Sequence, residues 1–328
     1  MHDSAPLPPD ADHVLISVNP KAGRRSAARR VDRLVDLLGR RGFDVAIHTD
    51  LAEVCAEADR LHAEGRLRAL VGIGGDGTAA ELANRTKEGV PLTLLAAGTA
   101  NLLSKHFGFS GHPERLCQSI VEGNLLRIDA GRAAGRLFLV MVGCGFDADV
   151  VRRVHSHREA NPRGAHIGYA SYTKPILESI RSYGYPEIQV YWGRPAEREA
   201  EDRPALVTAR WVFVCNLPRY GWGMRVAPQA VPTDGLLDVC AFRRGSLFHG
   251  LRYTAAVQLG GWHRRLSDCV TRQARQLRIT SEEPVAYQLD GDPGGVLPLD
   301  VETVPRRVTL VVPATWEKLP GPRWKSEP

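Results

Sequence analysis

Apolar residues recur with two different periods in the first third of the chain. Short runs rich in Val, Ile and Leu alternate with stretches in which apolar residues return every three or four positions. This alternation predicts strands and helices in turn, and therefore a parallel sheet with helices on both faces. The predicted strands are 13–19, 44–48, 68–73 and 92–96, and the predicted helices between them are 26–41, 51–64 and 78–87.

The pattern changes after Leu126, where strand-like runs become more frequent than helical ones. The predicted strands are 136–142, 187–192, 206–216, 236–242, 276–280, 285–289 and 308–312, and helical patterns lie near 148–155, 166–182 and 247–259. Many strands with few helices predict a β-sandwich that carries helices at its edge. We therefore expect an α/β domain over 13–126 and a β-sandwich domain over 127–304, with 305–320 packing back on the first domain and flexible ends at 1–12 and 321–328.

Composition narrows the class of protein. The chain has 328 residues, 43% of them hydrophobic and 24% charged, which argues against a disordered, collagen-like or disulfide-stapled protein. No apolar run approaches the roughly 20 residues that span a bilayer. The polar start is unlike a secretory signal, and the six cysteines never form C-x-x-C, so we expect a cytoplasmic protein with buried free thiols.

The net charge of +6 is compatible with nucleic acid, an anionic membrane surface or a phosphorylated substrate as partner. Zinc-finger spacing and aromatic-basic interleaving are both missing, so nucleic acid is not an expected partner. The charge alone does not choose between the other two.

The strongest local signal is the string Gly74-Gly75-Asp76-Gly77-Thr78, which follows a buried strand and opens a helix. The glycines allow a tight turn and a close approach of the backbone to a ligand. Amide groups at a helix N-terminus favour phosphate oxygens. Asp76 would repel phosphate unless a Mg²⁺ ion bridged the two, so we predict a phosphate site with magnesium. A plain turn with an aspartate N-cap is the alternative.

Two further turns follow other strands of the same predicted sheet. The first is Asn19-Pro20-Lys21-Ala22-Gly23, with Arg24 behind it, and the second contains Gly98, Thr99 and Asn101. Each alone could be an ordinary helix start. The carboxyl ends of parallel strands share one edge, where open α/β sheets bind ligands, so together the three turns predict one phosphate-binding rim.

These strings together resemble the catalytic domain of the diacylglycerol kinase and sphingosine kinase family, in its bacterial soluble branch. The second half agrees through three more strings. They are V-G-C-G-F-D-A-D at 142–149, A-P-Q-A-V-P-T-D-G-L-L-D at 227–238 and L-D-G-D at 289–292. The motifs keep the family's order and cover nearly the whole chain, about 13–313.

The resemblance implies an ATP-dependent lipid kinase with a nucleotide-binding α/β domain like that of NAD kinases, joined to a β-sandwich. It implies that 19–23 and 74–78 hold the phosphates of ATP, with Thr99 and Asn101 beside the nucleotide. Asp234 and the Leu236 carbonyl match a family position that binds a structural Mg²⁺. The last acid of the family's L-D-G-E string is its proton acceptor. Here that position is Asp292, and we take Asp292 and Asp76 as the candidate catalytic residues.

Two positions depart from the family pattern. Asp292 stands where the family has Glu, so the carboxylate reaches less far, and either the backbone compensates or Asp290 shares the role. Leu102 stands where many relatives carry an acid after the asparagine, which removes one carboxylate from the site.

The expected acceptor is a lipid hydroxyl, most simply that of diacylglycerol. A sphingoid base, a soluble acceptor such as NAD, and a catalytically impaired relative that only binds nucleotide or lipid are the alternatives. A lipid substrate requires transient contact with a membrane surface. The basic helix over 24–41 and the apolar stretch over 167–180 are candidate contact surfaces, although a solvated face and core packing would explain them equally well. A homodimer is left open.

Overall fold

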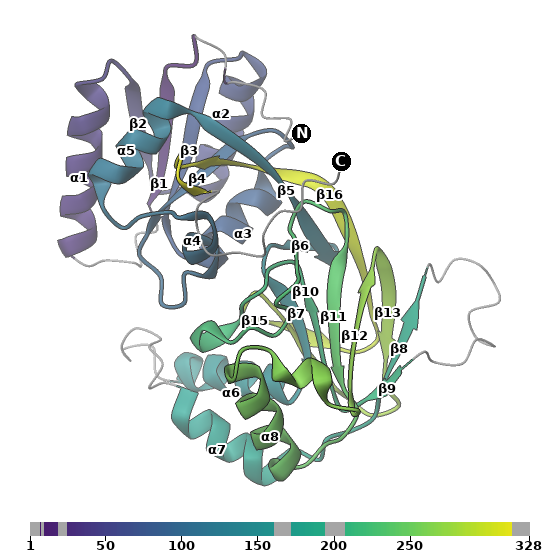
Figure 1. Cartoon of the computed structure of the whole chain (residues 1–328). Coiled ribbons are helices and arrows are strands. Elements are labelled where there is room, and N and C mark those ends of the chain that lie inside the picture. Colours follow the sequence, from purple (N-terminus) through teal and green to yellow (C-terminus); the bar gives the residue numbers. More distant parts are fainter. Residues whose placement is uncertain (1–6, 8–9, 19–24, 161–171, 194–206, 317–328) are drawn as a thin grey trace. The chain divides into compact units, whose positions relative to one another are not determined.

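The structure is a computed structural model that describes residues 7, 10–18, 25–160, 172–193 and 207–316. The chain divides into two compact units, one formed by the residues up to Asp129 together with those from Pro305 onward, and the other by Ala130–Val304. The strands β5 (Asn124–Ala133) and β16 (Leu299–Val312) carry the chain from one unit to the other (Figure 1). Each unit is described below by itself.

The first unit contains a parallel sheet in the order β2-β1-β3-β4, to which the last part of β16 adds beside β4. These strands are β1 (His13–Val18), β2 (Asp44–His48), β3 (Leu67–Gly74) and β4 (Pro91–Ala96). Helices α1 (Arg25–Gly39) and α5 (Pro113–Glu122) lie on one face, and α2 (Leu51–Ala63) and α3 (Asp76–Arg85) lie on the other. The apolar stripe of α1, including Leu34 and Leu38, packs on Val14 and Val71 of the sheet, as the helical period predicts.

The second unit is a sandwich of two largely antiparallel sheets. One sheet has the order β12-β11-β10-β7-β14-β15, and the other contains the first part of β16 with β13, β8 and β9. The strands of this unit are β6 (Arg136–Phe138), β7 (Met141–Gly145), β8 (Ile188–Trp192), β9 (Val207–Ala209), β10 (Trp211–Cys215), β11 (Leu237–Phe242), β12 (Cys269–Ala274), β13 (Gln276–Thr280), β14 (Ala286–Leu289) and β15 (Asp292–Val296). Inward-facing side chains such as Val142, Val214, Val190 and Ile279 form one shared core. The predicted α/β domain and β-sandwich are both confirmed.

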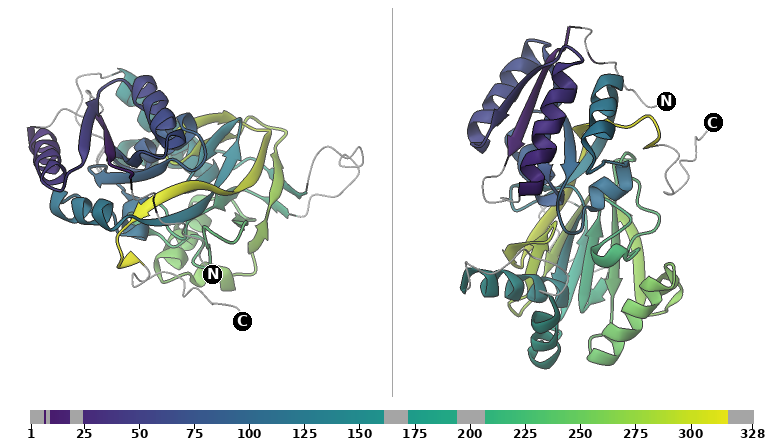
Figure 2. Two further views of the ribbon diagram at one scale, coloured as in Figure 1. Left: turned by 90° about the horizontal axis from the view of Figure 1, so that it is seen from above. Right: turned by 90° about the vertical axis from the view of Figure 1, so that its left-hand side faces the viewer.

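The remaining helices are short or lie at the sandwich. They are α4 (Leu102–Phe107), α6 (Phe146–Ala160), α7 (Thr173–Ser182), α8 (Leu247–Gln258) and the 3₁₀ turns η3 (Gly221–Gly223) and η4 (Trp262–Arg265). Figure 2 shows α7 and α8 as separate helices of the second unit.

Two predicted strands prove to be interrupted. The run 136–142 divides into β6 and β7. The amides of Leu139 and Val140 donate to the carboxylate of Asp290 and not to a neighbouring strand. The run 206–216 divides at Arg210. The sequence analysis also missed β5, β12 and β15, whose polar and glycine residues hide the alternation.

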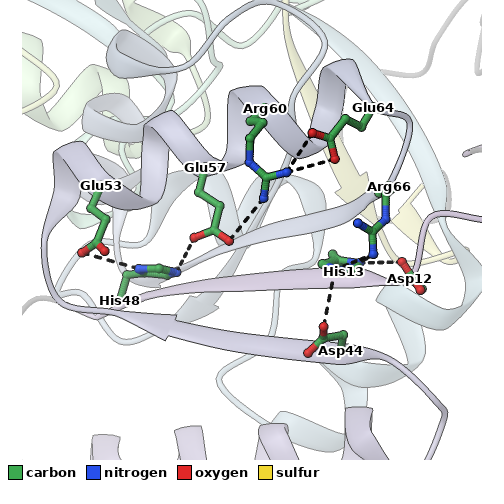
Figure 3. A network of polar contacts seen from close by, with 9 residues as sticks. All are labelled: Asp12, His13, Asp44, His48, Glu53, Glu57, Arg60, Glu64 and Arg66. Carbon is green, nitrogen blue, oxygen red and sulfur yellow. Dashed lines mark hydrogen bonds and ion pairs between the residues drawn. The ribbon is translucent and has the colours of Figure 1, made fainter.

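Ion pairs connect one edge of the parallel sheet to the helix that covers it (Figure 3). His48 at the end of β2 lies between Glu53 and Glu57 of α2, and its Nε2 is 2.9 Å from Glu57 Oε2. His13 of β1 contacts Asp44 of β2 and Arg66 in the segment before β3, so these contacts connect strand ends to each other. Elsewhere the six cysteines are free thiols, five of them buried and Cys269 partly so, which confirms the expectation from their spacing.

Candidate functional site

The glycine turns of the first unit contact each other through their backbones. Gly74 ends β3 and accepts the amide of Ala97, and Gly75 precedes the first residue of α3. A Cβ added to Gly98 would lie 2.7 Å from the Cα of Gly75, so neither turn has room for a side chain at this point. The predicted meeting of the Gly74–Thr78 and Gly98–Asn101 turns is therefore present in the described residues.

Asp76 connects these two turns. Its Oδ2 accepts the amide of Leu102 at 2.9 Å and its Oδ1 accepts that of Leu103 at 2.8 Å, so it satisfies the first turn of α4 from the neighbouring strand end. The carboxylate is buried, and this burial raises its pKa despite the two amides. Asp76 is therefore not the N-cap of α3, the helix that it opens, and its carboxylate supports the start of α4 instead. The side chain of Leu102 is buried, and its backbone amide is the group that meets Asp76.

Asn101 holds the second turn in shape. It has a left-handed backbone (φ 49°), its Oδ1 accepts the amide of Gly98 at 3.0 Å and its Nδ2 donates to the carbonyl of Gly98 at 2.8 Å. Thr99 lies on the surface of this closed loop. The α3 helix that begins beside it has ten residues, and no side-chain cap was found at its N-terminus. The amides of Gly77 and Thr78 lie in this first turn, which is the arrangement that phosphate oxygens favour.

The third predicted turn lies outside the described residues. Asn19, Pro20, Lys21, Ala22 and Gly23 follow β1 directly, and their phosphate-binding role stays a prediction.

In the second unit the string L-D-G-D forms a tight hairpin between β14 and β15. Leu289 pairs with Asp292, and the two residues between them, Asp290 and Gly291, have φ values of 52° and 93°. Positive φ at both central positions is the backbone of a type I′ turn, for which Asp-Gly is a preferred pair. The motif therefore has a structural reason to carry this dipeptide.

The two carboxylates of this hairpin have different surroundings. Asp290 accepts the amides of Leu139, Val140 and Met141 at 2.7 to 2.9 Å, so its carboxylate is used to fix the start of β7. These three hydrogen bonds favour Asp292 over Asp290 as the proton acceptor, which stays a prediction. Asp292 has a side chain that is 50% exposed and lies 3.7 Å from Nε2 of His155 on α6. It is the carboxylate of the motif that remains open to an acceptor.

A buried pair joins this hairpin to the turn at 142–149. Gln288 accepts the amide of Gly291 at 2.7 Å and donates to Asp147 Oδ2 at 3.0 Å. Burial raises the pKa of Asp147 to about 6, and hydrogen bonds from Tyr220 and Gln288 partly oppose that rise. The two family strings of the second unit are thus one hydrogen-bonded assembly.

The predicted magnesium position lies in the loop before β11. Asp234 Oδ1 accepts the amide of Leu236 at 2.9 Å, and its Oδ2 is 3.4 Å from Nε2 of Gln273. Asp238 nearby is buried, its Oδ1 has no hydrogen-bond partner among the described residues, and burial raises its pKa to about 6. Two oxygen-bearing acids with an unsatisfied buried atom suit a hard cation. Groups of three or more His, Cys, Asp or Glu with metal-site geometry are not found in the described part of the chain.

The sequence analysis missed three residues of these assemblies. A partner that is distant in sequence reveals the roles of His155 and Gln288, and burial reveals that of Asp238. Asp238 alone carried a signal, since it closes the string at 227–238.

No helix in the described ranges is long and apolar enough to cross a membrane.

Comparisons with known proteins agree with this architecture. Residues 13–133 match the model of the diacylglycerol kinase catalytic domain, and residues 140–312 match that of the YegS C-terminal NAD kinase beta sandwich-like domain. The chain is 24% identical to the diacylglycerol kinase of Bacillus subtilis (strain 168) over 309 residues, which cover 91% of this chain and 95% of that protein. It is 26% identical to the diacylglycerol kinase of Mycobacterium tuberculosis (strain ATCC 25618 / H37Rv), covering 90% of this chain and 93% of the relative.

Solved structures share the fold. A crystal structure of a diacylglycerol kinase from Bacillus anthracis str. Sterne has a TM-score of 0.61 at 17% identity and covers 93% of this chain and 98% of that chain. An NAD kinase from Archaeoglobus fulgidus in complex with ATP has a TM-score of 0.51 at 12% identity, covering 93% and 94% of the two chains. The fold is therefore that of the kinases that join an α/β domain to a β-sandwich. Within that class, the chain belongs to the family of diacylglycerol kinases and YegS-like lipid kinases.

Proposed function

We propose that this protein transfers the γ-phosphoryl group of ATP to a hydroxyl group of a lipid of the diacylglycerol type. The observation that carries the proposal is the set of family motifs, of which those in the described residues form assemblies that suit phosphoryl transfer. The glycine turns offer helix amides in the first unit, and the hairpin of the second unit leaves one open carboxylate, Asp292.

In the first unit, the residues at 74–78 and 98–101 would receive the phosphates of ATP. Phosphoryl transfer needs positioning and charge neutralisation more than covalent help from the protein. The amides at the start of α3 supply both, because they have fixed directions and carry partial positive charge. Asp76 contributes by holding α4 and the Gly98–Asn101 loop in place. Asn19–Gly23 would add the charge of Lys21.

In the second unit, Asp292 would accept the proton of the lipid hydroxyl as the new P–O bond forms. A general base must be ionised and reachable, and the half-exposed Asp292 meets the second condition. His155 at 3.7 Å limits the directions that the carboxylate takes.

Asp234 and the Leu236 carbonyl, with the unsatisfied Asp238, would hold a structural Mg²⁺. Bound there, the cation would neutralise the two acids of the loop before β11. Magnesium that accompanies ATP would supply charge neutralisation at the phosphates.

A panel of acceptors tests the activity. Purified protein is incubated with labelled ATP and Mg²⁺, and with diacylglycerol, monoacylglycerol, a sphingoid base or NAD in separate reactions. Label in a diacylglycerol product supports the proposal. Label only in the sphingoid base or only in NAD replaces it with that acceptor, and no label with any of the four favours a protein that binds without catalysis.

The substitution Asp292→Asn tests the proton acceptor. We expect turnover to fall by about 10²-fold or more while ATP binding is kept, because an amide cannot take the proton. Asp292→Glu restores the family residue and is the matched control, which should stay active. Full activity of Asp292→Asn would show that another group accepts the proton.

A further inference from the structure

The helix α8 is held to the sandwich by one face only. Tyr253 is fully buried, stacks on Phe242 of β11 with ring centroids 4.3 Å apart, and donates to Asp268 at 2.8 Å. Arg252 makes two hydrogen bonds to the same carboxylate, and Ser246 caps the start of the helix. In η4, His263 is buried and bonds the carbonyl of Val226. Buried contacts with the sandwich and its loops thus fix the position of α8 and η4.

Leu247, Phe248 and Leu251 on the opposite face of α8 are apolar and exposed, and so are Leu259 and Trp262 after its end. Leu247, Phe248, Leu251, Leu259 and Trp262 are 45%, 71%, 62%, 68% and 59% exposed. These five are most of the eight large hydrophobic residues found exposed in the described chain, and they lie within one short segment. Apolar side chains gathered in this way mark a surface that meets a partner.

The charge of this segment has a single sign. Between Arg243 and Ser267 the chain contains five arginines and no Asp or Glu. Asp268 balances Arg252, so the excess comes from two exposed pairs, Arg243 with Arg244 before α8 and Arg264 with Arg265 in η4. The guanidinium of Arg265 lies over the ring of Trp262 at 5.3 Å. The apolar stripe therefore has positive charge at both of its ends.

We propose that α8 and η4 form a docking surface for anionic lipid bilayers. This docking surface consists of Leu247, Phe248, Leu251, Leu259 and Trp262, with Arg243, Arg244, Arg264 and Arg265 around them. A helix with one apolar face and flanking cations is the type that lies in the interface of an anionic membrane. Its use in catalysis rests on the proposed lipid kinase activity, whereas the binding itself needs no ATP.

Two other surfaces fit less well. A second copy of the chain would bring equal arginine pairs against each other across a twofold axis, which disfavours self-association here. The helix α1, which the sequence made a candidate for membrane contact, uses two of its arginines within the protein. Arg33 pairs with Asp36 and Glu114, and Arg30 donates to the carbonyl of Ala96.

Co-sedimentation with vesicles, without nucleotide, tests the proposal. The vesicles contain phosphatidylglycerol or, for comparison, phosphatidylcholine alone. We expect Phe248→Ser with Leu251→Ser to weaken binding to the anionic vesicles by about tenfold or more, since two apolar anchors are lost. Arg243→Gln with Arg244→Gln should weaken it by about tenfold at low salt and reduce its dependence on salt. Ile47→Ser is the matched control, because Ile47 is exposed in the first unit, and it should bind like the wild type.

Three outcomes would overturn the docking surface. They are unchanged vesicle binding by both double variants, an equal loss in Ile47→Ser, and a wild-type dimer that the Phe248→Ser and Leu251→Ser substitutions dissociate. Circular dichroism of each variant verifies folding. Activity on a short-chain, water-soluble diacylglycerol separates the two proposals. A wild type that phosphorylates it but ignores anionic vesicles refutes only the docking surface, whereas one that binds vesicles through α8 but phosphorylates no lipid refutes only the kinase activity.

Discussion

In both units an aspartate of a family motif accepts backbone amides, but only the second unit has a further motif carboxylate that is exposed. In the first unit Asp76 accepts two backbone amides of α4, and in the second Asp290 accepts three backbone amides at the start of β7. Each acid thus holds a neighbouring segment in place, and neither carboxylate bonds only within its own turn. Only the hairpin of the second unit adds another carboxylate, Asp292, which is half exposed and beside His155. The hydrogen bonds therefore distinguish acids that hold backbone segments from an acid that is open to solvent, and the catalytic roles of Asp76 and Asp292 stay predictions.

Removal of the Asp290 carboxylate should have the largest effect on stability. Asp290→Ala leaves three amides without an acceptor, and we expect the free energy of unfolding to fall by about 3–4 kcal/mol. Urea unfolding followed by circular dichroism measures this loss. Asp292→Asn, two residues away, is the control and should unfold like the wild type. Equal losses in the two variants would remove the distinction between them.

Asp76→Ala should cost less stability, about 2 kcal/mol, because two amides lose their acceptor while the cost of burying a charge is also removed. It should nevertheless weaken ATP binding, since the Gly98–Asn101 loop loses its support. Titration calorimetry measures the affinity for ATP. Asp290→Ala, measured at a temperature where it is folded, shows whether a stability loss in the other unit changes that affinity. ATP binding that is unchanged in Asp76→Ala would place the nucleotide elsewhere.

The smallest effect concerns pH. Burial raises the pKa of Asp147 to about 6, above its unfolded value of 3.8, so the folded protein binds the proton more tightly. Asp147 therefore makes the protein less stable as pH rises from about 4 to about 6. In Asp147→Asn this contribution is absent, so the variant should gain about 2 kcal/mol relative to the wild type between pH 4 and pH 7. Urea unfolding at both pH values measures the gain, and a constant difference would contradict the shifted pKa.

The sequence by itself determined β1 to β4 and α1 to α3 of the first unit and the location of its glycine turns, whereas α4, α5 and β5 were not predicted. The predicted strands and helices follow apolar periods that neighbouring residues encode. Gly75 and Gly98 mark turns because a side chain at either position would have no room where the two turns meet. The family could be recognised for the same reason, since its motifs are continuous strings. The short strands β12 and β15 were missed because glycine and polar residues carry no clear period.

Only the tertiary structure decided what the side chains of those strings do. Asp76 reaches Leu102 because β3 and β4 are neighbours in the sheet, and Asp290 reaches Leu139 across 151 positions of the chain. Asp292 meets His155 because the hairpin and α6 pack together in the second unit. Such hydrogen bonds and ion pairs depend on strand order and register, which arise from the packing of the whole core and from no local pattern.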